Sequence, residues 1–69
     1  MVTIKEISKK IKAARKEKKM NQSELADICG VGRRFVSELE SSKKERYDLA
    51  LTLRVLQRLG LHLIFESDK

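Results

Sequence analysis

The residues of this chain best suited to chemistry are two adjacent arginines, Arg33 and Arg34, which directly follow the short sequence Gly-Val-Gly. A guanidinium group can donate two hydrogen bonds to the O6 and N7 atoms of guanine. Ser37 lies one helical turn later and offers a hydroxyl group to a base or a phosphate. Glu38 either accepts from cytosine N4 or pairs with Arg34 within the same helix. These four residues predict a helix face that contacts the edges of base pairs.

Two short helices joined by a sharp turn are expected to position this face. The first runs from about residue 22 to residue 29, and Asn21 before it is a good N-cap residue. Gly30 stands just past this helix, where a left-handed backbone lets the chain turn. Gly32 then takes the N-cap of a helix over residues 33–41. This is the layout of a helix-turn-helix unit, whose second helix enters the major groove of DNA.

A longer amphipathic helix is predicted over residues 3–19. Its apolar residues recur at helical spacing, with lysines between them: Ile4, Ile7, Ile11 and Ala14. Residues 1–19 hold eight basic and two acidic side chains, whereas the remaining fifty residues hold eight of each. The net charge of +6 therefore belongs to this segment. Concentrated positive charge is typical of proteins that bind polyanions, and the alternative is a solvated lysine-rich face.

A fourth helix is predicted over about residues 49–59, with Asp48 as its cap and Gly60 as its stop. Its apolar stripe is expected to consist of Leu49, Leu53, Leu56 and Leu59. A strand is conceivable at the start of this segment, where every second residue is leucine, but the pattern from Val55 onward favours a helix.

The segment after Gly60 has a different character, because six residues of mostly apolar, β-favouring type follow one another: Leu61, His62, Leu63, Ile64, Phe65 and Glu66. A single strand needs a partner for its backbone groups, and no other segment of the chain reads as a strand. The simplest partner is the same segment of a second chain, paired antiparallel about a two-fold axis. The alternative is an extended tail packed on the helices.

Basic residues around the helix-turn-helix unit are candidates for contacts with phosphates, which position a protein on DNA. Lys43, Lys44 and Arg46 follow the second helix of the unit, while Lys19 and Asn21 precede its first helix. The competing interpretation of the loop lysines is that they are only solvated surface charge.

Several classes of protein are excluded or disfavoured. Cys29 is the only cysteine and His62 the only histidine, so neither an internal disulfide nor a zinc-ligand cluster is expected. Cys29 is expected to fill a small core position, and His62 to be an exposed strand residue. The sequence contains no nucleophile–base set and no phosphate-binding glycine loop, so we expect no enzyme, cofactor or metal.

The expected location is the reduced cytoplasm of a prokaryote, at the nucleoid. No apolar run approaches the length of a membrane span, and the N-terminus lacks a secretory signal. A helix lying on a membrane surface at residues 3–19 would need Trp or Phe residues that this segment lacks.

The pattern from residue 7 to residue 60 resembles the Xre family of helix-turn-helix proteins, which includes the lambdoid phage repressors and Cro. The residues that carry this resemblance are Gln22, Leu25, Ala26, Cys29, Gly30, Val31, Val36 and Leu39. The resemblance implies that Gln22 meets a phosphate at the start of the first helix of the unit. It also implies that Arg15 and Glu40 form a structural pair between the helices at residues 3–19 and 33–41.

A narrower resemblance is to the HipB-type antitoxins. It rests on the sequence Gly-Val-Gly-Arg-Arg-Phe-Val-Ser-Glu-Leu-Glu and on Leu-Arg-Val-Leu-Gln-Arg-Leu-Gly-Leu-His-Leu further along. Such proteins are Xre domains with a short C-terminal strand that pairs in the dimer. The resemblance implies a repressor that binds its own operon and holds a HipA-type kinase toxin.

The expected architecture is thus one domain over residues 1–69, all-α with four helices in the manner of lambda repressor, with the C-terminal strand at residues 61–66 pairing across a dimer. Chains this short bury little core and gain stability by oligomerisation. The expected function is that of a dimeric, sequence-specific repressor of a palindromic operator, serving as an antitoxin. The alternatives are a phage-type repressor or restriction-modification controller without a toxin, and a protein-interaction module that binds only a toxin.

Overall fold

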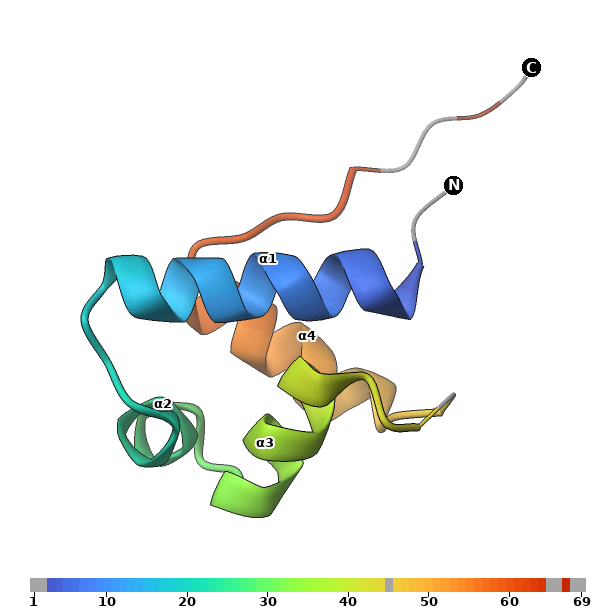
Figure 1. Cartoon of the computed structure of the whole chain (residues 1–69). Helices are drawn as coiled ribbons and strands as arrows, with labels where there is room; N and C mark the ends of the chain where they lie inside the picture. Colours follow the sequence, from blue (N-terminus) through green and yellow to red (C-terminus); the bar gives the residue numbers. More distant parts are fainter. Residues whose placement is uncertain (1–2, 45, 65–66, 68–69) are drawn as a thin grey trace.

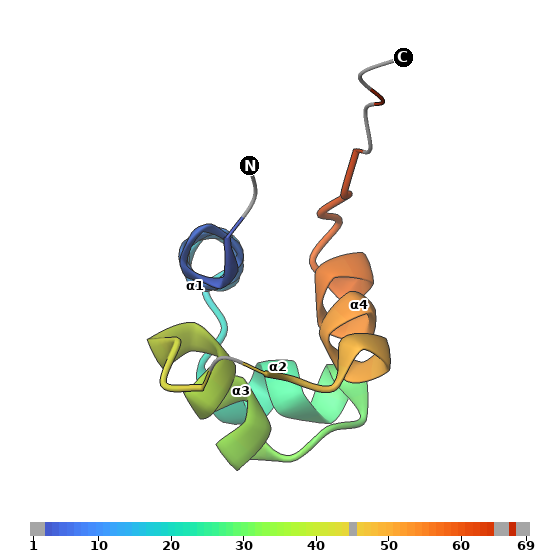
Figure 2. The ribbon, with the colours of Figure 1, turned by 90° about the vertical axis from the view of Figure 1, so that its right-hand side faces the viewer.

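Four helices make up the fold of the computed structural model, which describes residues 3–44, 46–64 and 67. They are α1 (Ile4–Glu17), α2 (Gln22–Cys29), α3 (Arg33–Ser41) and α4 (Leu49–Arg58) (Figure 1). The view along α1 shows α3 and α2 beneath it and α4 on the other side of the molecule (Figure 2). The expected four-helix fold is confirmed.

Polar caps explain where three of these helices begin. The side chain of Thr3 accepts a hydrogen bond from the backbone N–H of Glu6 at the start of α1, at 3.2 Å. The side chain of Asn21 accepts from the backbone N–H of Glu24 at 2.8 Å, and the Glu24 carboxylate accepts from the backbone N–H of Asn21 at 2.9 Å. This reciprocal capping box starts α2 at the expected residue. The side chain of Asp48 accepts a hydrogen bond from the backbone N–H of Leu51 at 3.0 Å and so caps α4, without a reciprocal bond.

Left-handed backbone conformations end the helices. α1 ends at Glu17, two residues earlier than expected, and Lys19 then adopts a φ of 58°. Gly30 has a φ of 69° after α2, and the N–H of Val31 reaches back to donate to the carbonyl of Ala26 at 3.0 Å. A Cβ atom at Gly30 would lie 3.7 Å from its nearest neighbour, so backbone conformation and not lack of space favours glycine here.

One apolar core joins all four helices. Its fully buried members include one isoleucine of α1 and the small residues that let α2 approach its neighbours: Ile11, Leu25, Ala26, Cys29, Val36, Leu39, Val55, Leu56 and Leu59. Cys29 is only 2% exposed, and this burial raises the pKa of its thiol. The structure therefore places Cys29 in the core, as expected from its size.

The buried face of α4 differs from the predicted leucine stripe. Leu56 and Leu59 are buried as expected, but Leu49 is 69% exposed and Leu53 is 43% exposed. Thr52 and Val55 are buried instead. The reason is the rotation of α4 about its own axis: Thr52, Val55, Leu56 and Leu59 follow one another at helical spacing on the face toward the core, whereas Leu49 and Leu53 lie off that face.

The tail after α4 alternates between partly buried and exposed side chains. Leu61 and Leu63 pack against the core, whereas His62 is exposed and Ile64 is 82% exposed. This period of two is that of an extended strand. No strand is assigned within residues 3–44, 46–64 and 67 of this single chain, and Phe65 and Glu66 lie outside the described residues. The expected pairing of this segment therefore stays a prediction.

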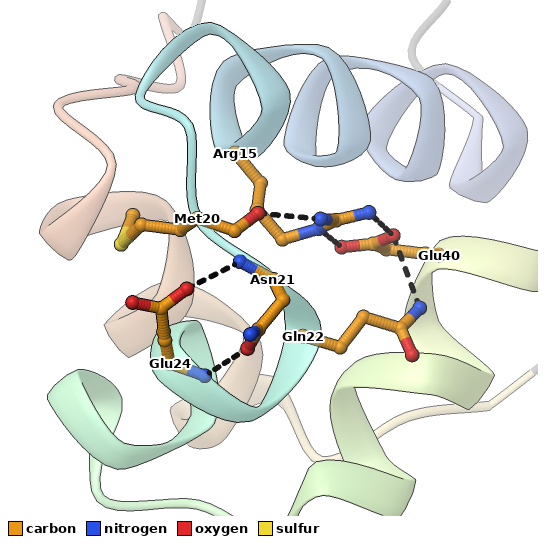
Figure 3. A network of polar contacts seen from close by, with 6 residues as sticks. All are labelled: Arg15, Met20, Asn21, Gln22, Glu24 and Glu40. Carbon is orange, nitrogen blue, oxygen red and sulfur yellow. Dashed lines mark hydrogen bonds and ion pairs between the residues drawn. The ribbon is translucent and has the colours of Figure 1, made fainter.

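A buried ion pair connects α1 to α3. The Nε atom of Arg15 lies 2.7 Å from Oε2 of Glu40, and its Nη2 atom donates to Oε1 at 3.0 Å. The Nη1 atom of the same guanidinium donates to the carbonyl of Met20 at 2.7 Å, so the pair also holds the chain between α1 and α2 (Figure 3). The side chains are 10% and 3% exposed. Hydrogen bonding to Glu40 raises the pKa of Arg15, so the guanidinium stays charged.

Replacing Glu40 with Ala is expected to lower the free energy of unfolding by about 3 kcal/mol, because the guanidinium of Arg15 would lose its carboxylate inside the protein. Glu40→Gln keeps an acceptor and should cost less. Urea unfolding followed by circular dichroism measures the change.

The matched control for this experiment is Glu38→Ala, two residues earlier on the same helix. The ion pairs of Glu38 with Arg34 and Lys44 lie at the surface, so their loss should cost much less than the loss of the buried pair. Equal costs for the two alanine variants would contradict the structural role of the buried pair.

Candidate nucleic-acid interface

The outer face of α3 carries the residues predicted to contact bases. Val36 and Leu39 are buried against the rest of the molecule, whereas Arg33, Arg34 and Ser37 point away from the core and are exposed. The side chain of Arg34 is 93% exposed. One face of the helix is thus fixed by the core, and the other presents two guanidinium groups and a hydroxyl group to solvent.

Glu38 is tied to two basic side chains. One carboxylate oxygen lies 3.0 Å from Nε of Arg34, and the other lies 2.6 Å from Nζ of Lys44. The hydrogen bond from Lys44, with a further one from Arg34, holds the pKa of Glu38 below its usual value. Of the two roles considered for Glu38, the free protein therefore shows the intrahelical pair with Arg34, and it adds a link to the following loop.

Tyr47 fixes the loop between α3 and α4, a role that sequence reasoning missed. Its hydroxyl donates to the backbone carbonyl of Glu38 at 2.7 Å and accepts from the backbone N–H of Lys44 at 3.0 Å. Its ring meets the ring of Phe35 edge-on, with centroids 6.4 Å apart. A single tyrosine directly after a polar loop was the available signal. Tyr47 holds Lys44 at a defined place beside α3.

The start of α2 is held to α3 through Gln22. The side-chain amide of Gln22 donates to Oε1 of Glu40 at 3.3 Å, so it joins the network of Arg15 and Glu40 (Figure 3). Asn21 is occupied by the capping box, while Lys19 is exposed in the turn before it. This network fixes the position of the N-terminus of α2, and with it the direction of its positive helix dipole.

The basic residues of the loop after α3, which were predicted to contact phosphates, lie on two different parts of the surface. Lys43 is exposed beside Lys44 in the loop after α3. Arg46 instead lines a groove on the side of α1 and α4, together with Ile4, Tyr47 and Leu49. The structure therefore groups Lys43 and Lys44 near the outer face of α3 and separates Arg46 from them.

Other kinds of site were sought in the part of the chain that the structure describes. There, three or more His, Cys, Asp or Glu side chains do not gather in any group able to hold a metal ion. The helices of that part are also too short or too polar to span a bilayer.

Comparisons with known proteins agree with this geometry. The family profile HTH_3, described as helix-turn-helix, matches residues 11–59. The uncharacterized HTH-type transcriptional regulator y4mF of Sinorhizobium fredii is 42% identical over 50 residues, which make up 72% of this chain and 64% of that protein. This chain thus spans less than two thirds of the length of that curated relative.

Solved structures show the same fold over the full length of the chain. A HipB–O4 20mer complex contains a chain that is 23% identical, with a TM-score of 0.83, covering 100% of this chain and 96% of that one. A structure described as MDT Protein gives the same identity, TM-score and coverage. Since the family profile extends from the middle of α1 to the end of α4 and includes both helices of the central unit, this chain belongs to the helix-turn-helix family of the Xre type.

Proposed function

We propose that this chain is a sequence-specific DNA-binding transcriptional repressor whose helix α3 enters the major groove. The observation that carries the proposal is the outer face of α3, where Arg33, Arg34 and Ser37 are exposed while the opposite face is fixed in the core. Arg33 forms no hydrogen bond or ion pair with the described residues. Guanine is the base that such a free guanidinium group recognises best.

Contacts with the phosphates would come from both sides of α3. Gln22 and the N-terminus of α2 would meet one strand, assisted by Asn21 and Lys19, because a helix N-terminus with free N–H groups binds anions. Lys43 and Lys44 would contact the phosphates of the DNA backbone on the other side of α3. Arg46 would contact them only if its side chain left its groove. The fixed positions of Gln22 and Lys44 support this assignment.

The repressor would act as a homodimer. The alternating tail at residues 61–64 supports antiparallel pairing with a second copy, since its exposed residues lie on one side and its buried residues on the other. Two copies of α3 about 34 Å apart would then contact successive major grooves of a palindromic operator.

The antitoxin role is the more specific part of the proposal. It is supported by the HipB-like sequence around Arg33 and Arg34 and by the fold shared with HipB. The chain would repress its own operon at the nucleoid, in the cytoplasm, and bind a HipA-type kinase. A kinase-sized open reading frame next to the gene would favour this role over that of a phage-type repressor or restriction-modification controller.

Replacing Arg33 with Ala should weaken binding to the operator by about 1–3 kcal/mol and relax the preference at one base pair. Replacing Lys43 with Ala should instead weaken binding to all sequences alike, because a phosphate carries no sequence information. Gel-shift titrations with the chain's own promoter and with scrambled DNA measure both effects. Equal affinity of the unaltered protein for the two DNAs would refute the sequence-specific function.

Replacing Glu38 with Gln tests the two roles considered for this residue. If the carboxylate only holds Arg34 and Lys44, its removal frees two cations, and affinity for scrambled DNA should rise about threefold to tenfold at low salt. A loss of affinity confined to the operator would show that Glu38 reads a base instead. The same titrations measure this effect, with Asp27→Asn as a control, because Asp27 is exposed on α2 away from its N-terminus and the substitution removes the same charge.

Deleting residues 61–69 should convert the dimer to a monomer, as measured by light scattering. Ile64→Asp tests the same surface with a single change, because Ile64 is exposed in the isolated chain and its replacement leaves the core intact. Leu53→Asp is the control, since Leu53 is exposed on α4. A dimer that survives both tail changes would rule out strand pairing.

A further inference from the structure

Four lysines form a stripe along α1, and we call them the α1 stripe: Lys5, Lys9, Lys12 and Lys16. Their spacings of four, three and four residues place them on one face of the helix. All four are exposed. At the rise of an α-helix, the stripe is about 16 Å long.

The α1 stripe lies on the flank of α1 that adjoins α3. On the neighbouring side of the helix, the hydroxyl of Ser8 donates to the carbonyl of Leu39 and the guanidinium of Arg15 pairs with Glu40. Lys12 lies four residues after Ser8 and three before Arg15, so it follows directly on that side. The stripe therefore faces outward beside α3. It lies away from a second groove, between α1 and the tail, which is lined by Glu6 and Lys10 on one side and by Leu61 and Leu63 on the other.

Both ends of the stripe reach segments already assigned to phosphate contact. At its first end, Lys5 lines a surface hollow together with Ser42 and Lys44 of the loop after α3. At its other end, Lys16 adjoins Arg15, whose guanidinium contacts both Met20 and Glu40 before the start of α2 (Figure 3). The stripe thus connects the two basic margins of the proposed interface.

In the part of the chain that the structure describes, the lysines of the stripe form no ion pair with the two acidic residues of α1, although Glu6 lies three residues before Lys9. Like charges three and four residues apart destabilise a helix. Glu6 lines the groove on the tail side together with Ile7 and Lys10, and Glu17 is not three or four residues from any lysine of the stripe. Within the described residues, no carboxylate forms an ion pair with these lysines. The repulsion among them would be relieved by an extended polyanion along the helix.

We propose that the α1 stripe binds the phosphates of duplex DNA that flanks the base pairs contacted by α3. The inference rests on the proposed function, because the stripe borders, at Lys5, the loop whose Lys44 is proposed to contact the duplex beside α3. A length of about 16 Å spans roughly five phosphates of one strand at their 3.4 Å axial spacing, which suits four lysines. The stripe extends the contact with DNA without reading its sequence.

The test variant is Lys9→Gln with Lys12→Gln, in the middle of the stripe. Its matched control is Lys10→Gln with Arg58→Gln, which removes the same charge from other surfaces and leaves the stripe intact. Circular dichroism melting checks that both variants are folded. Two duplexes are compared: the minimal operator, and the same operator with ten added base pairs on each side.

The measurement is the dissociation constant as a function of KCl concentration. For the unaltered protein we expect a steeper salt dependence on the extended duplex than on the minimal one. The stripe variant should lose this difference, with a slope lower by roughly 0.9 for each phosphate contact removed. It should also bind the extended duplex several-fold more weakly, while the control variant behaves like the unaltered protein.

The possible failures are distinguishable. Specific binding with equal salt slopes for both variants on both duplexes would overturn the stripe proposal and leave the proposed function standing. Absence of binding to either duplex at 50 mM KCl would overturn both. Vesicles with phosphatidylserine provide the other polyanionic surface. If the stripe variant loses binding to vesicles but not to DNA, the stripe serves a membrane and the proposal is wrong.

Discussion

The buried pair of Arg15 and Glu40 is the interaction on which the rest of this structure depends. It joins α1 to α3 with two parallel hydrogen bonds, and its third contact holds the carbonyl of Met20 between α1 and α2. Through Gln22 it also fixes the start of α2 (Figure 3). A small core cannot by itself orient three short helices, because apolar packing is non-directional. The two hydrogen bonds of this bidentate pair have a fixed geometry, so they can set the orientation of α1 relative to α3.

The polar contacts of the molecule separate groups that build the fold from groups left for a ligand. Arg15 is paired with Glu40 inside the protein, whereas Arg33 has no partner among the described residues. Arg34 and Lys44 are intermediate, because each is held by Glu38 at the surface, where an ion pair is weak and easily exchanged for a phosphate. How firmly each basic side chain is paired within the protein therefore says more about its availability to a ligand than the net charge does.

The features that sequence predicted well are local ones. Asn21 caps α2 and Gly30 takes the left-handed turn, because each depends only on its immediate neighbours in the chain. The exposure of Leu49 was mispredicted, since it depends on which face α4 turns toward the core. Tyr47 was missed because its hydroxyl bonds back to Glu38, nine residues earlier on α3, as well as to Lys44 in its own loop. The proposed pairing of the tail involves a second molecule, so the structure of a single chain cannot test it.

The burial of Cys29 makes its thiol a reporter of local unfolding in this protein. The thiol is the only one in the chain, it lies in the core beside α4, and burial raises its pKa. A thiol reacts as the thiolate, which burial disfavours. An alkylating reagent therefore modifies Cys29 only when α2 and α4 separate and expose it. The rate of labelling therefore reports the local unfolding equilibrium at the back of the helix-turn-helix unit, and any ligand that binds only the closed form would slow it.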